Sequence, residues 1–280
     1  MTISVNTNKP AMIALQALNR NSDQLTASQN RINTGLRIAG AKDNASVYAI
    51  AQAQRADISA LGAVRMSLDR AGSIADVAIA AGESISDLLN EMKEKVIAAK
   101  DTSLDTLSRD AVNSNFQSIL RQIQQVINNA AFDGANMLNG TITPGLSFLT
   151  DADATGAITL SAQLLALDAT GSAIALLSTD NVSTVAAADL VLPKLEASMK
   201  GVNTALANLG SQAKQIEAHK GFVLKLADVL EAGVGNLVDA DLAKESARLQ
   251  ALQVQQQLGA QALSIANQSP QIVLQLFRGG

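Results

Sequence analysis

The chain has 280 residues, of which 48% are hydrophobic and only 2% aromatic, and its formal net charge is −4. This weak acidic balance, without a cluster of lysine and arginine, argues against a nucleic-acid partner. No apolar run reaches the about 18 residues of a membrane span, and the absence of cysteine excludes disulfides and thiol chemistry.

The first predicted element is an amphipathic helix from Pro10 to about Arg31. Proline suits the first turn of a helix, because the missing N–H has no helical partner there. The apolar positions recur every seven residues, at Leu18, Leu25 and Ile32. Gly35 and Gly40 then predict a break, after which Asp43 or Asn44 can cap the next helix.

A second, longer helix is predicted from Ala45 to about Lys100. In its second half, apolar residues alternate in steps of four and three, at Ile74, Ala78, Ala81, Ile85, Leu88, Met92 and Val96. Gly62, Gly72 and Gly82 suggest the close approach of a neighbouring helix, and tolerated surface glycines are the alternative.

A third helix is predicted from about Leu104 to Ala131. Its apolar positions are Leu107, Ala111, Phe116, Ile119 or Leu120, Ile123 and Ile127.

The composition changes in the middle of the chain. Residues 141–193 lack lysine and arginine, and two short strands, Leu146–Thr150 and Ala157–Leu160, predict a hairpin. The loop between them imitates the first half of a calcium-binding loop, but its twelfth position is Ala162 where such loops carry a glutamate. We therefore expect a turn and no metal site, followed by irregular chain to Pro193.

A fourth predicted helix covers Leu195 to Leu237 and would measure about 60 Å. Its 4-3 alternation, the pattern of a coiled-coil seam, is interrupted only by Lys220; the positions are Leu195, Met199, Val202, Leu206, Leu209, Ala213, Ile216, Lys220, Val223, Ala227, Leu230, Val234 and Leu237. Gly233 and Gly235 weaken its end.

A last amphipathic helix is predicted from Asp239 to about Asn267, with Leu242, Leu249, Leu263 and Ala266 on one side. Pro270 is expected to interrupt it, leaving an apolar tail of Ile272, Val273, Leu274, Leu276 and Phe277.

These elements predict a mainly all-α fold: a long helical hairpin with paired N- and C-termini and a small β-hairpin in the middle. The stripes of the two ends pair with each other, or they also pack against other copies. Non-closing contacts of the second kind would give a helical filament.

The sequence offers no enzymatic or metal-binding constellation. His219 is the only histidine, and no metal-ligand spacing, phosphate-binding loop or nucleophile elbow is present. We expect no catalytic, cofactor-binding or metal site. The start of the chain does not resemble a Sec signal peptide, so composition alone would favour the cytoplasm.

Several motifs, in order at both ends of the chain, resemble the signatures of bacterial flagellins, in a short form without large outer domains. At the N-terminal side they are Val5–Asn8, Thr34–Ile38, Ala41–Ala45, Phe132–Gly134 and Met137–Gly140, and at the C-terminal side Asp239–Glu245 and Ala266–Leu274. The signature residues are Gly35, Leu36, Arg37, Lys42, Asp43, Asn267 and Pro270.

The resemblance implies three regions. Residues 1–44 and 236–280 would form an inner terminal coiled coil, residues 45–140 and 194–235 a helical rod, and residues 141–193 a solvent-facing segment. The self-assembly residues of the filament core would be Leu18, Leu25, Ile32, Leu242, Leu249, Leu263, Ile272, Val273, Leu276 and Phe277.

The resemblance also implies an extracellular subunit that polymerises into the flagellar filament for swimming motility, exported by the flagellar type III apparatus without a cleaved Sec signal. Its partners would be other copies, sibling flagellins, the export apparatus, an export chaperone, and the filament cap and hook-junction proteins. The alternatives are a hook–filament junction protein and a coiled-coil adapter or secreted effector. Met92–Ile97 departs from the epitope Gln-Arg-Val-Arg-Glu-Leu of flagellins that the animal toll-like receptor detects, so we expect no such recognition.

Overall fold

The computed structural model describes the backbone of residues 7–278 and the side chains up to residue 268. Within this range the elements are α1 (Lys9–Thr34), α2 (Ala45–Ala99), α3 (Thr106–Asn129), β1 (Ala131–Phe132), β2 (Ala135–Asn136), β3 (Gly145–Leu149), β4 (Ala157–Ser161), α4 (Val185–Val238) and α5 (Leu242–Arg278). They confirm the predicted fold class: mainly helical, with a small hairpin in the middle.

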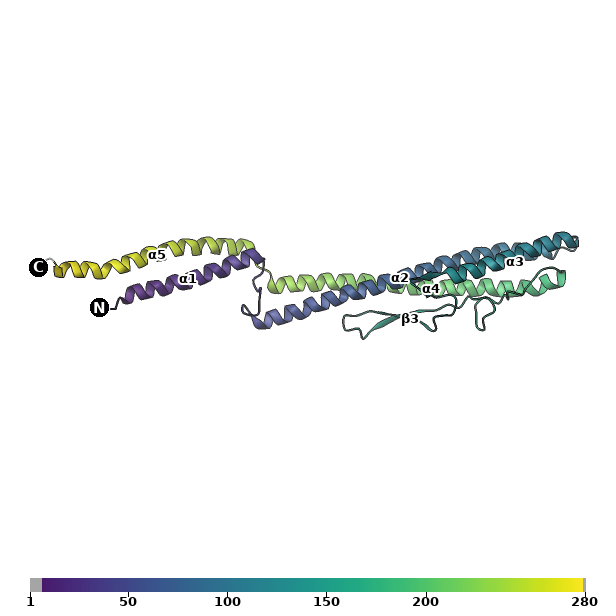
Figure 1. Ribbon diagram of the computed structural model, residues 1–280, viewed down its shortest axis with the longest axis horizontal. Helices are drawn as coiled ribbons and strands as arrows, with labels where there is room; N and C mark the ends of the chain where they lie inside the picture. Colours follow the sequence, from purple (N-terminus) through teal and green to yellow (C-terminus); the bar gives the residue numbers. More distant parts are fainter. Residues whose placement is uncertain (1–6, 279–280) are drawn as a thin grey trace. The chain divides into compact units, whose positions relative to one another are not determined.

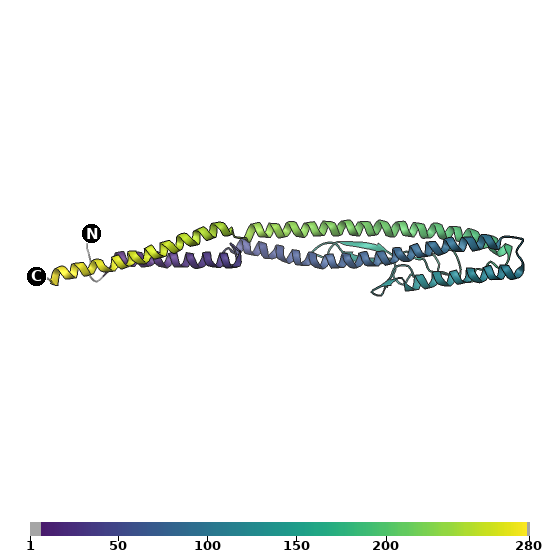
Figure 2. The ribbon, with the colours of Figure 1, turned by 90° about the horizontal axis from the view of Figure 1, so that it is seen from above.

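The chain divides into two compact units. The terminal unit contains the residues up to Ala56 and those from Val229 onward, and the central unit runs from Asp57 to Asp228. In the terminal unit α1 and α5 lie side by side in antiparallel directions (Figure 1 and Figure 2). In the central unit α2, α3 and α4 lie alongside one another, and the hairpin packs on them (Figure 1).

Side-chain caps set the beginnings of the helices. The Asn8 Oδ1 accepts a hydrogen bond from the Ala11 N–H at 3.1 Å, and Pro10 is the second residue of α1. Asn44 accepts from the Val47 N–H at the start of α2, and Asp105 accepts from the Ser108 N–H at the start of α3. Each cap satisfies a backbone N–H that has no partner inside its helix.

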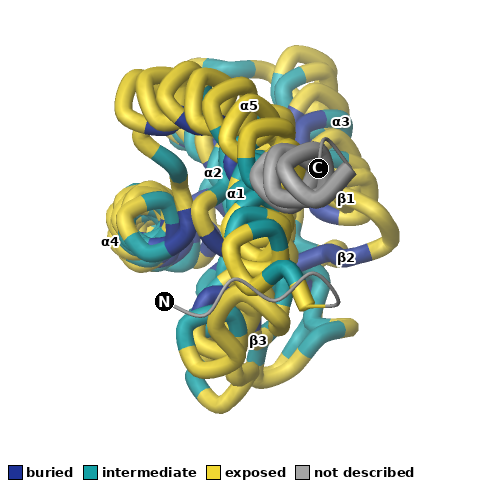
Figure 3. Tube along the Cα trace, turned by 90° about the vertical axis from the view of Figure 1, so that its left-hand side faces the viewer, coloured by how far each residue is buried: buried dark blue, intermediate teal, exposed yellow. Residues whose placement is uncertain are grey.

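The long seam of α4 is the core of the central unit. One residue in every seven is buried, at Ala188, Leu195, Val202, Leu209, Ile216 and Val223. Figure 3 shows the buried residues of α4 gathered on one side of the helix. Facing residues of α2 and α3 are also fully buried, among them Leu68, Ile74, Ile85, Leu89, Met92, Phe116, Ile123 and Ile127.

The second seven-residue column of the predicted α4 seam was wrong over most of its length, although Val234 at its end is buried as predicted. Its members at Met199, Leu206, Ala213, Lys220 and Ala227 are half-buried. The buried column in the first half of the helix is instead Val191, Ser198 and Ala205. The reason is that the irregular segment after β4 covers that side: the Ala175 N–H donates to the Ser198 Oγ at 2.9 Å.

Two apolar positions of α3 were also wrongly predicted to be buried. Leu107 and Ala111 are exposed. Arg109 occupies the contact with the end of α2, where its Nε donates to the Ala99 carbonyl at 3.2 Å and its Nη2 to the Asp101 carbonyl at 2.7 Å. The apolar contact of α3 therefore begins only at Phe116. In α2, likewise, Ala81 and Leu88 are half-buried, and their neighbours Gly82 and Leu89 face the core.

The prolines and glycines end the helices less often than predicted. Helix α4 begins ten residues before Leu195, capped by the Thr184 Oγ1 that accepts from the Ala187 N–H, and it contains Pro193. It continues to Val238, and α5 passes Pro270 and ends at Arg278. An interior proline costs about 3 kcal/mol and a glycine about 1 kcal/mol, which the burial of a long apolar seam outweighs.

The middle of the chain is packed rather than loose. Strands β3 and β4 form the predicted hairpin, antiparallel, with Leu146 opposite Leu160 and Phe148 opposite Ile158. The Leu149 N–H donates to the Ser67 Oγ of α2. On the other side, the Gln212 Oε1 of α4 accepts from the Ser161 N–H at 2.9 Å. In the loop, Asp151 accepts bonds from the N–H groups of Thr155 and Gly156, which makes it a turn, as predicted.

Of the three α2 glycines, one marks a close helix contact. A Cβ on Gly82 would lie 2.7 Å from the Leu206 Cδ2 of α4, whereas a Cβ on Gly62 or Gly72 would meet no atom within 4 Å. Close approach therefore explains Gly82, and the surface alternative holds for the other two.

Candidate assembly surface

The pair α1·α5 has a heptad seam on both helices. On α1 the inward positions are Ala14, Leu18, Asn21, Leu25, Ser28 and Ile32, and on α5 they are Glu245, Leu249, Leu252, Gly259, Leu263 and Ala266. Gly259 allows close approach, because a Cβ there would lie 3.3 Å from the Leu18 Cδ1. Steps of four and three, with a single step of seven from Leu252 to Gly259, keep these residues facing the partner helix.

Polar side chains of α1 reach the backbone of α5 at intervals along this seam. The Asn21 Nδ2 donates to the Leu252 carbonyl at 3.0 Å, and the Asn8 Nδ2 donates to the Ala266 carbonyl at 2.8 Å. These bonds satisfy side-chain N–H donors that the pairing of the helices partly removes from water, whereas the Asn21 Oδ1 is buried without a hydrogen-bond partner.

The seam contains one buried charge, at Glu245. The Ser28 Oγ donates to its Oε2 at 2.9 Å, and the Arg31 Nη1 lies 3.1 Å from its Oε1. Burial alone would raise the pKa of this carboxyl, but the Ser28 hydroxyl and the Arg31 guanidinium outweigh it and hold the pKa below its ordinary value. Glu245 is therefore an ionised carboxylate with two polar partners, Ser28 and Arg31. A buried carboxylate is tolerated when it is paired and hydrogen-bonded in this way.

Five of the predicted signature residues lie in the loop between α1 and α2, beside the start of α5: Gly35, Leu36, Arg37, Lys42 and Asp43. Gly35 ends α1 with a φ of 71°, a backbone conformation that suits glycine. Leu36 forms a β-bridge with Asp239, and the Arg37 Nη2 donates to the Leu237 carbonyl at 2.7 Å. Asp43 closes the loop by accepting from the Ala39 and Gly40 N–H groups. Lys42 and Asn267 are exposed.

The predicted self-assembly residues fall into three groups. Leu18, Leu25, Ile32, Leu249 and Leu263 are half-buried in the α1·α5 seam, and Leu242, the first residue of α5, is half-exposed. The side chains of Ile272, Val273, Leu276 and Phe277, with that of Pro270, lie outside the described residues.

Both terminal helices carry a further set of large apolar side chains that remain exposed. On α1 these are Met12, Ile13 and Leu15, and on α5 they are Val254, Leu258 and Ile265. Figure 3 shows that most of the described surface of α5 is exposed. Exposed apolar stripes of this extent are typical of interaction surfaces.

The polar members of the seam and Leu252 were not predicted. The predicted stripes contained apolar residues only, although Asn21 and Ser28 lie at the same seven-residue spacing, as do Glu245 and Leu252. Extending the heptad through polar residues would have found all four.

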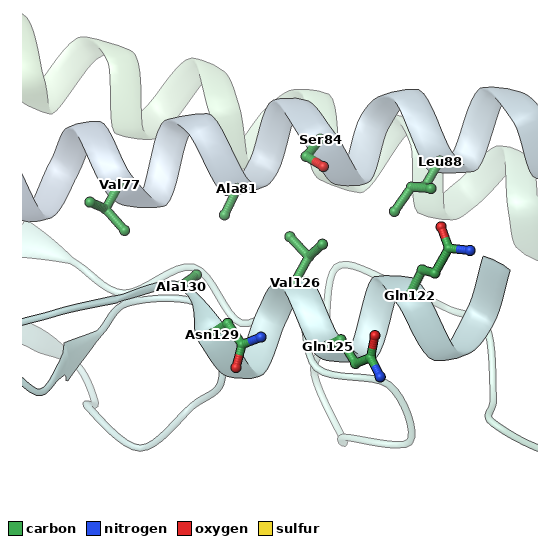
Figure 4. A pocket seen from close by; sticks show the side chains of 9 residues that line it. All are labelled: Val77, Ala81, Ser84, Leu88, Gln122, Gln125, Val126, Asn129 and Ala130. Carbon is green, nitrogen blue, oxygen red and sulfur yellow. The ribbon is translucent and has the colours of Figure 1, made fainter. Parts of the chain in front are cut away.

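The central unit has an open groove of about 530 Å³ between α2 and α3 (Figure 4). Val77, Ala81, Ser84 and Leu88 of α2 line one side, and Gln122, Gln125, Val126, Asn129 and Ala130 line the other. The lining residues offer amide and hydroxyl groups but none that ionises, so the groove has no general acid, base or metal ligand.

Two further chemical features are missing from the part of the chain that the structure describes. No three His, Asp or Glu side chains gather there as a metal would require. No helix in the same range combines the length and the apolar character needed to cross a membrane.

Comparison with known proteins gives consistent matches along the chain. The bacterial flagellin N-terminal helical region matches residues 5–143, and the bacterial flagellin C-terminal helical region matches residues 192–277. The chain is 55% identical to flagellin FljJ of Caulobacter vibrioides over 100% of both chains. It is 38% identical to a flagellin of Brucella melitensis over 99% of each.

Among solved structures, a putative flagellar hook-associated protein from Vibrio parahaemolyticus is similar in fold. Its TM-score is 0.58 at 15% identity, over 70% of this chain and 100% of that one.

Proposed function

The chain belongs to the bacterial flagellin family, and on this premise we propose that it polymerises through the exposed faces of its paired terminal helices, α1 and α5. As a flagellin it is a structural protein, not an enzyme, and a subunit of the extracellular flagellar filament that serves motility. The hook–filament junction and adapter alternatives are not favoured.

The observation that carries the proposal is the second apolar surface of the terminal unit. The α1·α5 seam already uses Leu18, Leu25 and Leu249, yet Val254, Leu258 and Ile265 of α5 remain exposed. Burying each against another subunit would contribute about 1.5–3 kcal/mol. Because every subunit of a filament makes the same contacts, this contribution is repeated along the polymer.

For the regions of the subunit, we propose the division that the family resemblance implies. Residues 1–44 and 236–280 form the filament core, residues 45–140 and 194–235 the rod, and residues 141–193 face outward. Leu242, Ile272, Val273, Leu276 and Phe277 belong to the core surface in this proposal, together with the half-buried seam residues.

We further propose the partners that a flagellin needs before and during assembly. These are the flagellar type III export apparatus, an export chaperone, the filament cap, the hook-junction proteins and sibling flagellins. Several relatives, FljJ and FljK among them, come from the single organism Caulobacter vibrioides, which supports co-assembly of sibling chains.

The test of the proposed surface is a matched pair of double variants in α5. Leu258→Ala with Ile265→Ala removes apolar side chains from the exposed face, and Gln257→Ala with Ser264→Ala removes exposed polar ones from adjacent positions. Sedimentation and electron microscopy after seeding should give a strongly raised critical concentration for the first variant only. Equal polymerisation of both variants would contradict the proposal.

A further inference from the structure

The apolar residues of the α1·α5 seam do not by themselves fix how α1 lies along α5. Large apolar residues are spaced by seven or fourteen positions on both helices, at Leu18, Leu25 and Ile32 of α1 and at Leu249 and Leu263 of α5. Helix α1 has 26 residues and α5 has 37, so a shift of α1 by seven residues toward the C-terminus of α5 keeps all of α1 paired. Two such registers differ in stability only through the residues that break the repeat.

Two of the other contacts along the seam also tolerate this shift. The Leu18 Cδ1 lies 3.3 Å from the place of a Cβ on Gly259, and the shift would bring Leu25 to the same place. The Asn21 Nδ2 donates to the backbone carbonyl of Leu252 at 3.0 Å, and every residue of a helix has such a carbonyl. Neither contact therefore distinguishes the two registers.

The contacts of Glu245, in contrast, exist in one register only. The Ser28 Oγ donates to its Oε2 at 2.9 Å, and the Arg31 Nη1 lies 3.1 Å from its Oε1. Ser28 is 2% exposed and Glu245 is 9% exposed, so both belong to the buried part of the seam. After the shift, Ser28 would face Leu252, which cannot accept a hydrogen bond, and Glu245 would face Gly35, which has no side chain.

The partners that distinguish the registers are those on α1. Burial raises the pKa of Glu245, and Ser28, Arg31 and Arg248 lower it. Arg248 lies on α5 and accompanies Glu245 in every register, whereas Ser28 and Arg31 do not. One hydrogen bond to a charged group is strong enough to change an equilibrium by about tenfold or more.

We propose that Ser28, Arg31 and Glu245 form a register lock, which selects one alignment of α1 along α5. A buried polar group in an otherwise apolar seam costs stability, and the selection of one register is the best-attested gain from it. The three residues act by positioning the two helices, since only the native alignment satisfies the hydroxyl, the guanidinium and the carboxylate together.

The register decides which exposed side chains of the two helices lie side by side. A shift of seven residues would move Met12, Ile13 and Leu15 of α1 by about 10 Å relative to Leu258 and Ile265 of α5. The register lock would thus fix the composite apolar surface of the terminal pair. This consequence rests on the proposed function, whereas the register lock itself does not depend on polymerisation.

Disulfide trapping tests the register lock, because the natural chain has no cysteine. Leu18→Cys is combined with Gly259→Cys to report the native register, and with Ala266→Cys to report the shifted one. Full-length chains, diluted so that only bonds within one chain form, are oxidised with copper phenanthroline. The rate of disulfide formation is followed by non-reducing electrophoresis, which also records pairs that form transiently.

The ratio of the two trapping rates measures the preference for the native register. With Glu245 present, the pair 18/259 should close about tenfold or more faster than the pair 18/266. Glu245→Leu should make the two rates comparable while the far-UV circular dichroism is unchanged. Gln250→Leu, at an exposed position of α5, is the matched control and should keep the original ratio. An original ratio in Glu245→Leu would show that other contacts set the register, and would overturn the inference.

Arg31→Met provides an independent measurement with α5 unchanged. It removes the guanidinium and keeps an apolar stem of similar length, so the pair 18/266 should close faster relative to the pair 18/259. A cluster that merely stabilised the helix pair would leave this ratio constant while both rates fell. An unchanged ratio, whatever the absolute rates, would overturn the inference.

Discussion

Substitution of Glu245 by glutamine should weaken the α1·α5 pair without changing its shape. The side chain of Glu245 is only 11% exposed, and it accepts bonds from the Ser28 hydroxyl and the Arg31 guanidinium. Glutamine can still accept the bond from Ser28, but its amide nitrogen or its neutral oxygen replaces the charged acceptor of Arg31. A hydrogen bond to a charged group contributes about 1.5–3 kcal/mol.

The lower part of that range applies here, because Arg31 is 32% exposed and water can replace part of the lost contact. A loss of about 1.5 kcal/mol would lower the melting temperature of a chain of this size by roughly 3–6 °C. The change in melting temperature is measured by heating filaments and monitoring their dissociation with circular dichroism and light scattering. Glu231→Gln, at an exposed position of α4, is the control.

The same contact makes a signed prediction for pH. The pKa of Glu245 lies below its ordinary value of 4.5 in the folded state, so the unfolded chain binds a proton more readily. The stabilisation is complete above about pH 4.5 and is lost as the pH falls through the lowered pKa. The difference in stability between wild type and Glu245→Gln should therefore shrink in acid. Equal melting temperatures at neutral pH, or a difference that grows in acid, would refute the reasoning.

Three further predictions concern the helices. Leu209→Ala, at a fully buried position of the α4 seam, should lower the free energy of unfolding, measured by chemical denaturation, by about 2–5 kcal/mol. Leu224→Ala, at an exposed position of the same helix, should lower it by less than about 1 kcal/mol. Equal losses would contradict the assignment of Leu209 to the buried seam. Gly62→Ala should raise the free energy of unfolding by about 1 kcal/mol, because a Cβ at position 62 would meet no atom within 4 Å. Gly82→Ala should raise it by less, because the Leu206 side chain must move. Melting temperatures of the two variants measure the difference, and a larger gain for Gly82→Ala would contradict the close helix approach. We also expect the terminal helices to fold fully only on assembly, because the free monomer lacks their filament neighbours. Limited proteolysis of the monomer should therefore remove roughly the first and last 40 residues and spare the central unit. Resistance of both ends to the protease would contradict folding on assembly.

The sequence predicted the helices well where a period of seven persists. Leu195, Val202, Leu209, Ile216 and Val223 were expected in the α4 core, and all five are buried. Such a column is visible in the sequence because each member faces the same neighbouring helix. The hairpin was visible for a related reason, since strand alternation and a polar loop define it locally.

The incorrect burial and boundary predictions have a common physical cause: the sequence does not show which distant segment packs against a given residue. Ser198 is buried because a distant segment donates a hydrogen bond to it, and Leu107 is exposed because Arg109 occupies the adjoining contact. Pro193 was read as a helix boundary, although packing along α4 outweighs its local cost.

At the terminal pair, apolar periodicity identified the helices but not the polar contacts between them. Ser28 and Arg31 each lie more than 200 residues from Glu245 in the sequence, so only the folded chain brings them together with it. Their burial follows from the antiparallel pairing of α1 and α5. A single sequence suggests this pairing, but it does not specify which residue of α1 lies opposite which residue of α5.

Deletion of residues 240–280 tests most directly the claim that the terminal helices make this chain a filament subunit. The truncated chain retains α2, α3 and α4 with their buried seam but lacks α5. Far-UV circular dichroism and thermal melting should show a folded helical protein, and electron microscopy after seeding should show no filaments. Filaments of normal length from the truncated chain would contradict the account.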